Sequence, residues 1–396
     1  MSQDTPMIQA PEISFRAPRC YDWRSLSAGD ESNKETKALA ERAREELSQM
    51  LRASLRMEHV VVLAGSGCSL SVRGPSMGDL WNAIVGAPAT AIADATAKTV
   101  GFDLTNTNIE AFLSHIEAWR SLHSDQDVET FLTSAKEIIL ERCSGFLKSA
   151  KLETHERFLH RLSRRGSRDR RLKLFTTNYD LCFEQATSAI GGVAIDGFSF
   201  MAPRRYDPRY FDYDIVRRPR SGETQSNYLE GVVLLHKLHG SVNWERHDGD
   251  IFETESPSPD KACLIYPATG KYQQSYSQPY LESISQYLAA LREPNTCVLV
   301  VGFGFNDDHL SEPLLSAVRS NPHLRLIVVD PSLESKNGKN NLNTFQDRLL
   351  EFGAKGEDVW FLNATFDAFA NQIPDLKSLT PAERLVNAVR GIQNTE

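Results

Sequence analysis

The sequence predicts an α/β protein with a doubly wound, mainly parallel, Rossmann-like sheet of about six strands. Two observations carry this prediction. Helical stretches, for example residues 307–320 and 345–352, alternate with short apolar runs that are rich in β-branched and aromatic residues and lack strict alternation. Strands buried on both faces of a parallel sheet have this pattern. The runs lie at residues 59–65, 172–177, 232–239, 297–302, 324–330 and 359–363.

The N-terminal part, residues 1–57, is expected to be an arm followed by a helix. The first ~30 residues are rich in Pro, Ser and acidic groups, which favours a loose arm. Residues 32–57 place Leu, Ala and Met at helical spacing, with Ser32 as the candidate N-cap. The main domain would then occupy residues 58–370, and residues 371–396 would form a helical tail.

Two intervals between the predicted strands are too long for simple crossovers. Residues 86–171 are mostly helical in pattern, with amphipathic stretches at 108–119 and 128–147. They predict an inserted helical subdomain or lid. Residues 191–231 are aromatic, Arg-rich and rich in turn residues, which indicates an irregular or short-stranded excursion.

Three shorter stretches carry their own expectations. Residues 242–253 have the pattern of a hairpin with its turn at 247–250. The aromatic stretch 265–280 is either a loop that closes over a site or an oligomer contact. The basic stretch 161–173 is expected to be a solvated helix end and loop, with a nucleic-acid or partner contact as the alternative.

Composition limits the classes of partner and the compartment. The 396 residues are 41% hydrophobic and 24% charged, as in ordinary folded proteins. The net charge of −8 argues against direct nucleic-acid binding, because phosphate recognition needs a basic footprint. The N-terminus has no signal pattern and no apolar run approaches a membrane span, so we expect a cytoplasmic protein that does not contact a membrane.

The cysteine spacing gives no sign of a metal site. No two of the six cysteines form a C-x-x-C pair, which makes a zinc ribbon improbable, and we expect no metal. Scattered single cysteines suit a reducing cytosol. They are Cys20, Cys68, Cys143, Cys182, Cys263 and Cys297.

Several predicted strands end in glycine pairs or polar clusters. Ligands of open α/β sheets bind at the carboxyl ends of the strands. Glycine turns allow close approach to phosphates, carboxylates and amides suit riboses, and a histidine suits a reacting centre. Together these ends predict a lined crevice for a dinucleotide. They are GSGCS at 65–69, TTNYD at 176–180, LHGS at 238–241, GFGFND at 302–307 and Asp330.

Each end also has a structural alternative. The first loop lacks the third glycine of G-x-G-x-x-G, because Leu70 holds that place, and no Gly-Lys-Ser/Thr follows, which disfavours a P-loop. Cys68 is expected to be a small packed side chain. His239 has a structural imidazole as its alternative, and Asp330 a simple turn aspartate. His309 follows a predicted helix cap and is expected to be an ordinary side chain of that helix. Metal ligation is the minor alternative.

The ordered set GSGCS, TTNYD, LHGS and GFGFND resembles the sirtuin family. Sirtuins carry a Gly-Ala-Gly-x-Ser loop, a Thr-Gln-Asn-Ile-Asp strand end, a His-Gly pair and a Gly-Thr/Phe-Gly-x-Ser/Asn loop in this order. The resemblance spans about residues 60–330. It implies that residues 58–370 form a sirtuin-like catalytic domain that binds NAD+ as its substrate.

Two departures from the sirtuin pattern matter. The four-cysteine zinc ribbon of the deacylases is missing, which puts the acyl-lysine groove in doubt. The Pro-Asp-Phe-Arg sequence after the glycine loop is replaced by RGPSMGDLW at residues 73–81. The chain therefore resembles the sirtuin-like NAD hydrolases of bacterial anti-phage defence, and among these it is similar to subunits that assemble with a HerA-like ATPase.

The resemblance also implies roles for individual residues. Asn178 would hold the nicotinamide ribose and orient water, and His239 would act as general base. Asp180 would hold the carboxamide of the leaving nicotinamide. The other NAD+-binding residues implied are Gly65, Ser66, Gly67, Cys68, Ser69, Thr177, Gly302, Gly304, Asn306 and Asp330.

The function that follows is hydrolysis of NAD+ to nicotinamide and ADP-ribose, which depletes NAD+ during infection. Such an activity must be restrained, so a homo-oligomer or a HerA-like partner is expected to act as the switch. Two alternatives remain: an NAD-dependent protein deacylase, and a non-catalytic NAD or ADP-ribose sensor that regulates a partner ATPase. The intact Asn178 and His239 weigh against the sensor.

Overall fold

The architecture comes from a computed structural model of the 396-residue chain. The predicted tail beyond residue 376, most of the aromatic stretch 265–280, and Ser32 lie outside the described residues. The structure describes residues 13–28, 33–165, 169–218, 227–265, 278–334 and 342–376.

A nine-stranded sheet, in the order β2-β1-β14-β13-β12-β3-β4-β8-β5, forms the centre of the described part of the chain. Its pairs are parallel except where β1 pairs with β14 and with β2. All six predicted strands are present, and the doubly wound α/β fold is confirmed. The strands are β1 (Ser14–Arg16), β2 (Arg24–Ser25), β3 (His59–Ala64), β4 (Leu172–Thr176), β5 (Val193–Ile195), β8 (Val232–Lys237), β12 (Thr296–Val301), β13 (Leu324–Val329) and β14 (Val359–Asn363).

The expectation of a loose N-terminal arm is wrong for residues 13–28. Strand β1 extends the sheet beyond β14, with Phe15 opposite Leu362. Phe15 is fully buried and stacks on Trp360 at a ring-centroid distance of 6.2 Å. Strands of two or three residues carry no readable periodicity, so β1, β2 and β5 could not be found from the pattern alone.

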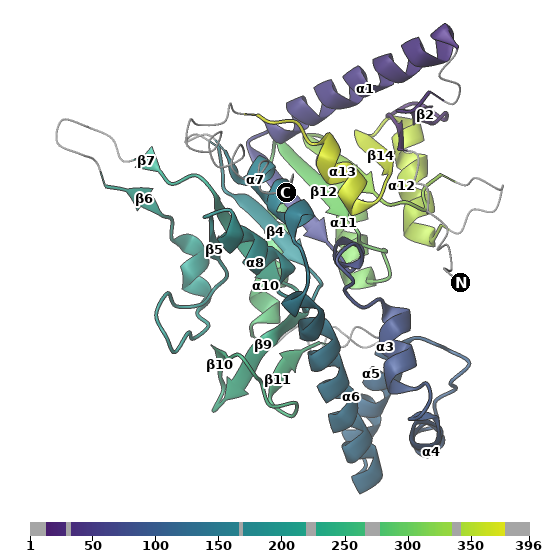
Figure 1. Ribbon diagram of the computed structural model, residues 1–396, viewed down its shortest axis with the longest axis vertical. Helices are drawn as coiled ribbons and strands as arrows, with labels where there is room; N and C mark the ends of the chain where they lie inside the picture. Colours follow the sequence, from purple (N-terminus) through teal and green to yellow (C-terminus); the bar gives the residue numbers. More distant parts are fainter. Residues whose placement is uncertain are drawn as a thin grey trace, which may run out of the picture.

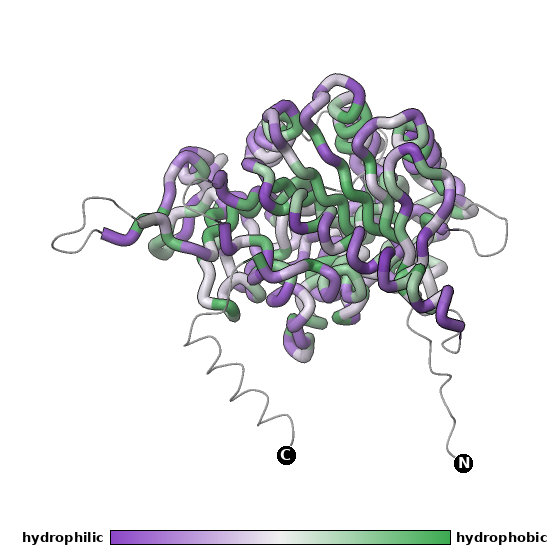
Figure 2. The backbone as a smooth tube through the Cα atoms, turned by 90° about the horizontal axis from the view of Figure 1, so that it is seen from above, coloured by the Kyte–Doolittle hydropathy of each residue, from purple (hydrophilic) through white to green (hydrophobic). Residues whose placement is uncertain are grey.

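Helices cover both faces of the sheet (Figure 1). In β3, Val60 and Val62 face one helical layer, and Val61 and Leu63 face the other. The strands therefore form the hydrophobic centre seen in Figure 2. One layer contains α1 (Lys34–Leu55), α7 (Glu153–Ser163), α8 (Cys182–Ala189) and α13 (Phe366–Gln372), and the other contains α10 (Tyr280–Ala290), α11 (Asp308–Ser320) and α12 (Thr344–Lys355).

The N-cap of helix α1 lies one residue later than expected. Asn33, not Ser32, is the N-cap, and its side chain accepts a hydrogen bond from the Glu35 amide at 2.9 Å. Asn and Ser are nearly equivalent at this position. The sequence therefore does not show which of these two adjacent residues is the N-cap.

A separate helical cluster lies below the sheet in Figure 1. It consists of α3 (Met77–Ile84), α4 (Thr90–Val100), α5 (Ile109–Arg120) and α6 (Gln126–Gly145), which share one hydrophobic core. The 3-10 helix η1 (Phe146–Lys148) follows α6.

The expected limits of 86–171 for this subdomain differ from the packing at both ends. Helix α3 precedes residue 86 and joins the cluster, whereas α7 packs against the sheet, where Phe158 is fully buried. All of these helices are amphipathic. Periodicity does not say which neighbour covers an apolar face.

The predicted hairpin at 242–253 is confirmed. It joins β9 (Gly240–His247) to β10 (Asp250–Glu253), with Asp248 (φ 48°) and Gly249 (φ 90°) at its turn. Two positive φ values suit the primed turns of hairpins. Strand β11 (Ala262–Leu264) completes this small sheet.

The excursion at 191–231 is short-stranded where the structure describes it. It contains β5, the 3-10 helix η2 and the pair of strands β6 and β7. These last three elements are η2 (Pro208–Asp212), β6 (Val216–Arg217) and β7 (Asn227–Tyr228).

The basic stretch at 161–173 contacts the chain's own carbonyl groups. Arg161 donates to the Ala370 carbonyl at the end of α13, at 3.0 Å. Arg165 is 6% exposed and donates to the Leu55 carbonyl at 3.0 Å and the Arg170 carbonyl at 2.8 Å. These two arginines therefore bind carbonyl groups at helix and loop ends, so the expectation of a solvated helix end and loop is wrong for them.

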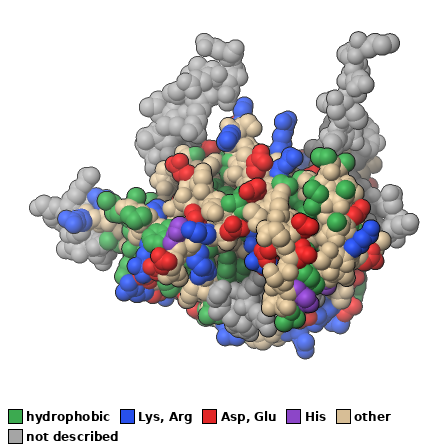
Figure 3. Space-filling model, turned by 90° about the horizontal axis from the view of Figure 1, so that it is seen from below, with side chains coloured by type: hydrophobic (Ala, Val, Ile, Leu, Met, Phe, Trp, Pro, Cys, Tyr) green, Lys and Arg blue, Asp and Glu red, His purple; other side chains and the backbone are tan. Residues whose placement is uncertain are grey.

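The exterior carries charges of both signs. Figure 3 shows Lys and Arg side chains interspersed with Asp and Glu over the face seen from below. None of the described helices is long and apolar enough to cross a membrane.

Candidate functional site

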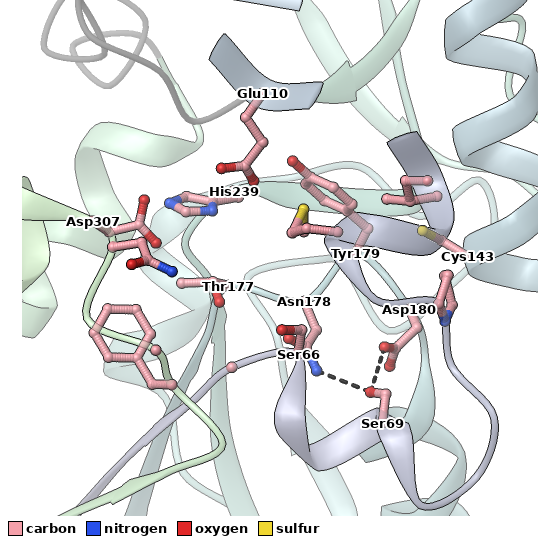
Figure 4. A pocket seen from close by; sticks show the side chains of 17 residues that line it. Ser66, Ser69, Glu110, Cys143, Thr177, Asn178, Tyr179, Asp180, His239 and Asp307 are labelled. Carbon is pink, nitrogen blue, oxygen red and sulfur yellow. Dashed lines mark hydrogen bonds between the residues drawn. The ribbon is translucent and has the colours of Figure 1, made fainter. Parts of the chain in front are cut away.

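A pocket lies where β3, β4, β8 and β12 reach their carboxyl ends (Figure 4). The chain runs from β3 to β4 on one side, whereas β12 lies on the other side of β3, so the winding of the sheet reverses here. Crevices at such switch points are the usual ligand sites of this fold class. The pocket is lined by Gly65, Ser66, Ser69, Pro75, Met77, Leu80, Glu110, Cys143, Thr177, Asn178, Tyr179, Asp180, His239, Phe303, Gly304, Asn306 and Asp307.

Three side chains in this pocket form one chain of hydrogen bonds. Asn178 Nδ2 donates to Ser69 Oγ at 3.0 Å, and Ser69 Oγ donates to Asp180 Oδ2 at 2.6 Å (Figure 4). Asn178 and Asp180 are each 7% exposed. A buried chain anchored on a carboxylate fixes each member. The amide of Asn178 is therefore held in one orientation.

The carboxylate of Asp180 is engaged by the protein on both oxygens. Its Oδ1 accepts from the Cys182 amide at 3.0 Å, at the start of α8, while Oδ2 accepts from Ser69. Asp180 thus positions Ser69 and, through it, Asn178. The predicted contact between this carboxylate and a nicotinamide carboxamide stays a prediction.

Lys237 contacts the segment that contains Asp180, and the sequence analysis did not predict this role. The side chain is 2% exposed, donates to the Asp180 carbonyl and lies 3.1 Å from Glu184 Oε1. A buried lysine requires such partners. The available signal was a charge inside the apolar run VVLLHKLH at 232–239.

His239 lies on the opposite wall, in the connection between β8 and β9. Its imidazole is 2% exposed and stacks on His309 of α11, with ring centroids 5.5 Å apart. The His239 carbonyl accepts from the Ile265 amide at 2.9 Å, which fixes the backbone. Asp307, at the N-cap of α11, lines the pocket beside it.

His309 therefore lies next to the pocket, where its ring packs on His239. Within the described ranges, no group of three or more His, Cys, Asp or Glu side chains could hold a metal ion. Tyr179 also lines the pocket, and its hydroxyl donates to the Ile265 carbonyl at 2.5 Å.

The helical cluster contributes four lining residues that the sequence prediction missed, and two of them, Glu110 and Cys143, are titratable. Glu110 of α5 directs its carboxylate toward His239 in Figure 4. Cys143 of α6 is buried, which raises the pKa of its thiol to about 12 and leaves it an unreactive thiol at neutral pH. Both lie on amphipathic helices far from the strand ends in sequence, so no local pattern marked them.

The paired glycines have a structural cause. A Cβ on Gly65 would lie 2.6 Å from the Gly302 carbonyl oxygen. Gly302 has φ of +60°, and a Cβ there would lie 2.5 Å from the Cys68 nitrogen. The loops after β3 and β12 therefore cross backbone to backbone, and only glycine permits this approach.

Several predicted binding residues do not reach the pocket lining. Gly67, Cys68 and Gly302 lie in the loop crossing, and Cys68 is fully buried, which raises the pKa of its thiol. Helix α2 (Gly67–Leu70), which follows the first loop, has only four residues and so provides little dipole for a phosphate.

Asp330 also lies apart from the pocket lining. It directly follows β13, which is separated from β3 by β12. Its Oδ1 accepts from the Ser332 amide at 2.8 Å, the geometry of a turn aspartate. The strand order, which the sequence does not state, explains this placement.

The remaining predicted residues line one pocket. They are Gly65, Ser66, Ser69, Thr177, Asn178, Asp180, His239, Gly304 and Asn306.

Residues 172–351 match a family model described as a SIR2-like domain. The match covers less than half of the chain. It begins at β4 and ends in α12, so it includes the strand ends with Asn178, His239 and Asn306. The first glycine loop and the helical cluster lie before it. No curated protein matches the chain.

Solved structures give distant likenesses to the same family. A mutant Sir2 homologue with 2′-O-acetyl ADP ribose has a TM-score of 0.43 at 13% identity, covering 84% of this chain and 98% of that one. A Sir2 homologue–NAD complex has a TM-score of 0.43 at 13% identity, covering 82% and 91%. A structure titled for sirtuin substrate affinity has a TM-score of 0.41 at 15% identity, covering 84% and 99%. These scores are low, so the fold class rests on the strand order itself.

Proposed function

We propose that this protein is an NAD+ glycohydrolase that cleaves NAD+ to nicotinamide and ADP-ribose. One observation carries the proposal. The hydrogen-bonded chain of Asn178, Ser69 and Asp180 faces His239 across one pocket at the switch point of the sheet. The match of residues 172–351 to a SIR2-like domain supports an NAD-related activity for these strand ends.

The charge of the pocket favours the nicotinamide end of the substrate. Its charged lining side chains among the described residues are the carboxylates Glu110, Asp180 and Asp307. The nicotinamide ring of NAD+ is a cation, and positive charge moves to the ribose as the glycosidic bond breaks. Carboxylates placed where positive charge develops stabilise the transition state. The diphosphate would extend toward Ser66, Gly304 and Asn306.

The reaction needs a fixed ribose and a positioned water more than it needs covalent chemistry. Asn178 would hold the nicotinamide ribose and orient the water. The bond from the anomeric carbon to the ring nitrogen breaks, its electron pair leaves with neutral nicotinamide, and the water oxygen bonds to that carbon. The water proton passes to His239 and then to solvent.

The first prediction concerns these two residues. Replacing Asn178 by Ala removes the group that holds ribose and water, and replacing His239 by Ala removes the base. Each should lower nicotinamide release by roughly 100-fold or more. We expect Ser69→Ala to lower it less, because the Asn178 amide loses its fixed orientation but keeps its place. Free nicotinamide is measured by chromatography after incubation with NAD+.

The matched control is Asn371→Ala, an exposed asparagine on α13, which should leave the rate unchanged. Full activity in both Asn178→Ala and His239→Ala would contradict the site. Release that requires an acylated peptide would favour the deacylase. Bound NAD+ without release under any condition would favour the sensor.

The biological setting is proposed from the sequence resemblance. NAD+ depletion in anti-phage defence would require restraint, which a homo-oligomer or a HerA-like ATPase could supply. The assay is therefore run with the protein alone and with the product of the neighbouring gene, and the assembly is sized by light scattering. Unchanged release and no complex under all conditions would contradict a partner-controlled enzyme.

A further inference from the structure

Glu110 is the carboxylate that the helical cluster brings into the pocket. It lies in the first turn of α5, where the Asn108 side chain caps the helix by accepting from the Ala111 amide at 3.0 Å. Its neighbours Ile109 and Phe112 are 2% and 0% exposed. The carboxylate is thus carried by a capped, well-packed helix.

The carboxylate is directed toward the imidazole of His239 (Figure 4). Among the residues that the structure describes, the other titratable groups around this ring are Asp307 and His309, from α11 and its cap, and Tyr179, from the end of β4. The His309 ring stacks on the His239 ring at 5.5 Å. A second imidazole so close disfavours a positive charge on His239, whereas a carboxylate favours it.

We propose that Glu110 is a positioning residue for His239. Its carboxylate fixes the orientation and tautomer of the imidazole and stabilises the imidazolium that forms when His239 takes the water proton. A buried carboxylate plays this part beside the histidine of hydrolytic triads. The inference rests on the proposed function and deepens it, because it assigns a residue outside the SIR2-like match to the same reaction.

Glu110 makes the site depend on the packing of the helical cluster. Asn178, Asp180 and His239 belong to the strand ends of the main sheet, but Glu110 belongs to the helical cluster. The site is complete only while the helical cluster stays packed against Tyr179 and Val242, which share its hydrophobic core. A partner that displaces the helical cluster would therefore lower activity without contacting Asn178 or His239.

The test compares Glu110→Gln, Glu110→Asp and the control Glu137→Gln, which removes an exposed glutamate from α6 of the same cluster. In Glu110→Gln we expect kcat to fall roughly tenfold or more with little change in KM. The acidic limb of the pH–rate profile should move to lower pH by roughly one unit, because loss of the carboxylate favours the neutral imidazole. Glu110→Asp should recover part of the lost kcat and part of the shift in the pH–rate profile. Glu137→Gln should match wild type in both measurements.

A second measurement does not depend on catalysis. Histidine side-chain NMR titration of the full-length protein, with the His239 signal identified through a His239→Gln variant, should show its midpoint at lower pH in Glu110→Gln than in wild type. This shift would support the inference even if NAD+ cleavage were never observed, so the two proposals can fail separately.

Three results would overturn the inference. One is an unchanged His239 titration in Glu110→Gln. Another is a rise in KM alone with an unmoved pH profile, which would make Glu110 a substrate-binding charge. The third is an equal loss in Glu137→Gln, which would indicate a general effect on the helical cluster. Circular dichroism melting confirms that each variant is folded before it is assayed.

Discussion

At the scale of single residues, some of the glycines that suggested a phosphate-binding loop also allow the loops after β3 and β12 to approach closely. Gly65 and Gly302 lie where two backbones cross. Gly304 lines the pocket, and among the described residues a Cβ there would meet the Asn306 side chain, at 3.1 Å. Both kinds of glycine look alike in the sequence. Their neighbours in space separate the structural glycine from the one that faces the pocket.

This difference predicts unequal effects on stability. Gly302→Ala places a Cβ against the Cys68 backbone at a positive φ, so it should lower the free energy of unfolding by roughly 3 kcal/mol. Gly304→Ala should cost less than about 1 kcal/mol, because a flexible side chain can move aside. Urea denaturation of the pair measures both. Equal losses would contradict the crossing as the reason for Gly302.

At the scale of elements, a charge pair between the buried Lys237 and the partly buried Glu184 stabilises the junction between β8 and α8. Lys237 joins the Asp180 carbonyl to the Glu184 carboxylate. Burial raises the pKa of Glu184, and the neighbouring lysine partly offsets this. The pair thus connects β8, which precedes His239, to the helix that follows Asp180.

Lys237→Met should therefore destabilise the protein by roughly 3 kcal/mol, because it leaves a partly buried carboxylate without its cation. Lys237→Met with Glu184→Gln should recover part of this loss. The pKa of Glu184 in the single variant lies further above its unfolded value, so the folded state binds the extra proton. The deficit should shrink as the pH falls toward 4.5. Chemical denaturation at several pH values tests this, and a constant deficit would contradict it.

At the scale of the whole molecule, two histidines are buried within the aromatic packing of the sheet layers. His155 lies between Phe183 and Phe366, and His236 between Phe175 and Phe211. The ring nitrogens of both have no hydrogen-bond partner among the residues described.

These imidazoles predict acid sensitivity. Burial lowers the pKa of His155 to about 4 and that of His236 to about 3. Below the ordinary value of 6.5, the unfolded chain binds protons that the folded chain does not, so the free energy of unfolding should fall as the pH drops from 6.5 toward 4.

The slope should be about 1 kcal/mol per pH unit for each histidine. His155→Phe and His236→Phe should flatten it, and the exposed His323→Gln should not. Thermal or urea unfolding across this pH range provides the measurement. Parallel slopes in all variants would contradict the assignment.

The sequence by itself determined the α/β class, the six central strands and the strand ends that carry Asn178, Asp180 and His239. Strands buried on both faces and polar groups at their ends are local patterns, and the parallel winding brings those ends together. The tertiary structure alone decided which residues meet there: Asp330 is excluded by the strand order, and Lys237 and Glu110 are included by packing. A side chain delivered by a separate helical cluster leaves no mark in local periodicity, because its partner lies more than a hundred residues away.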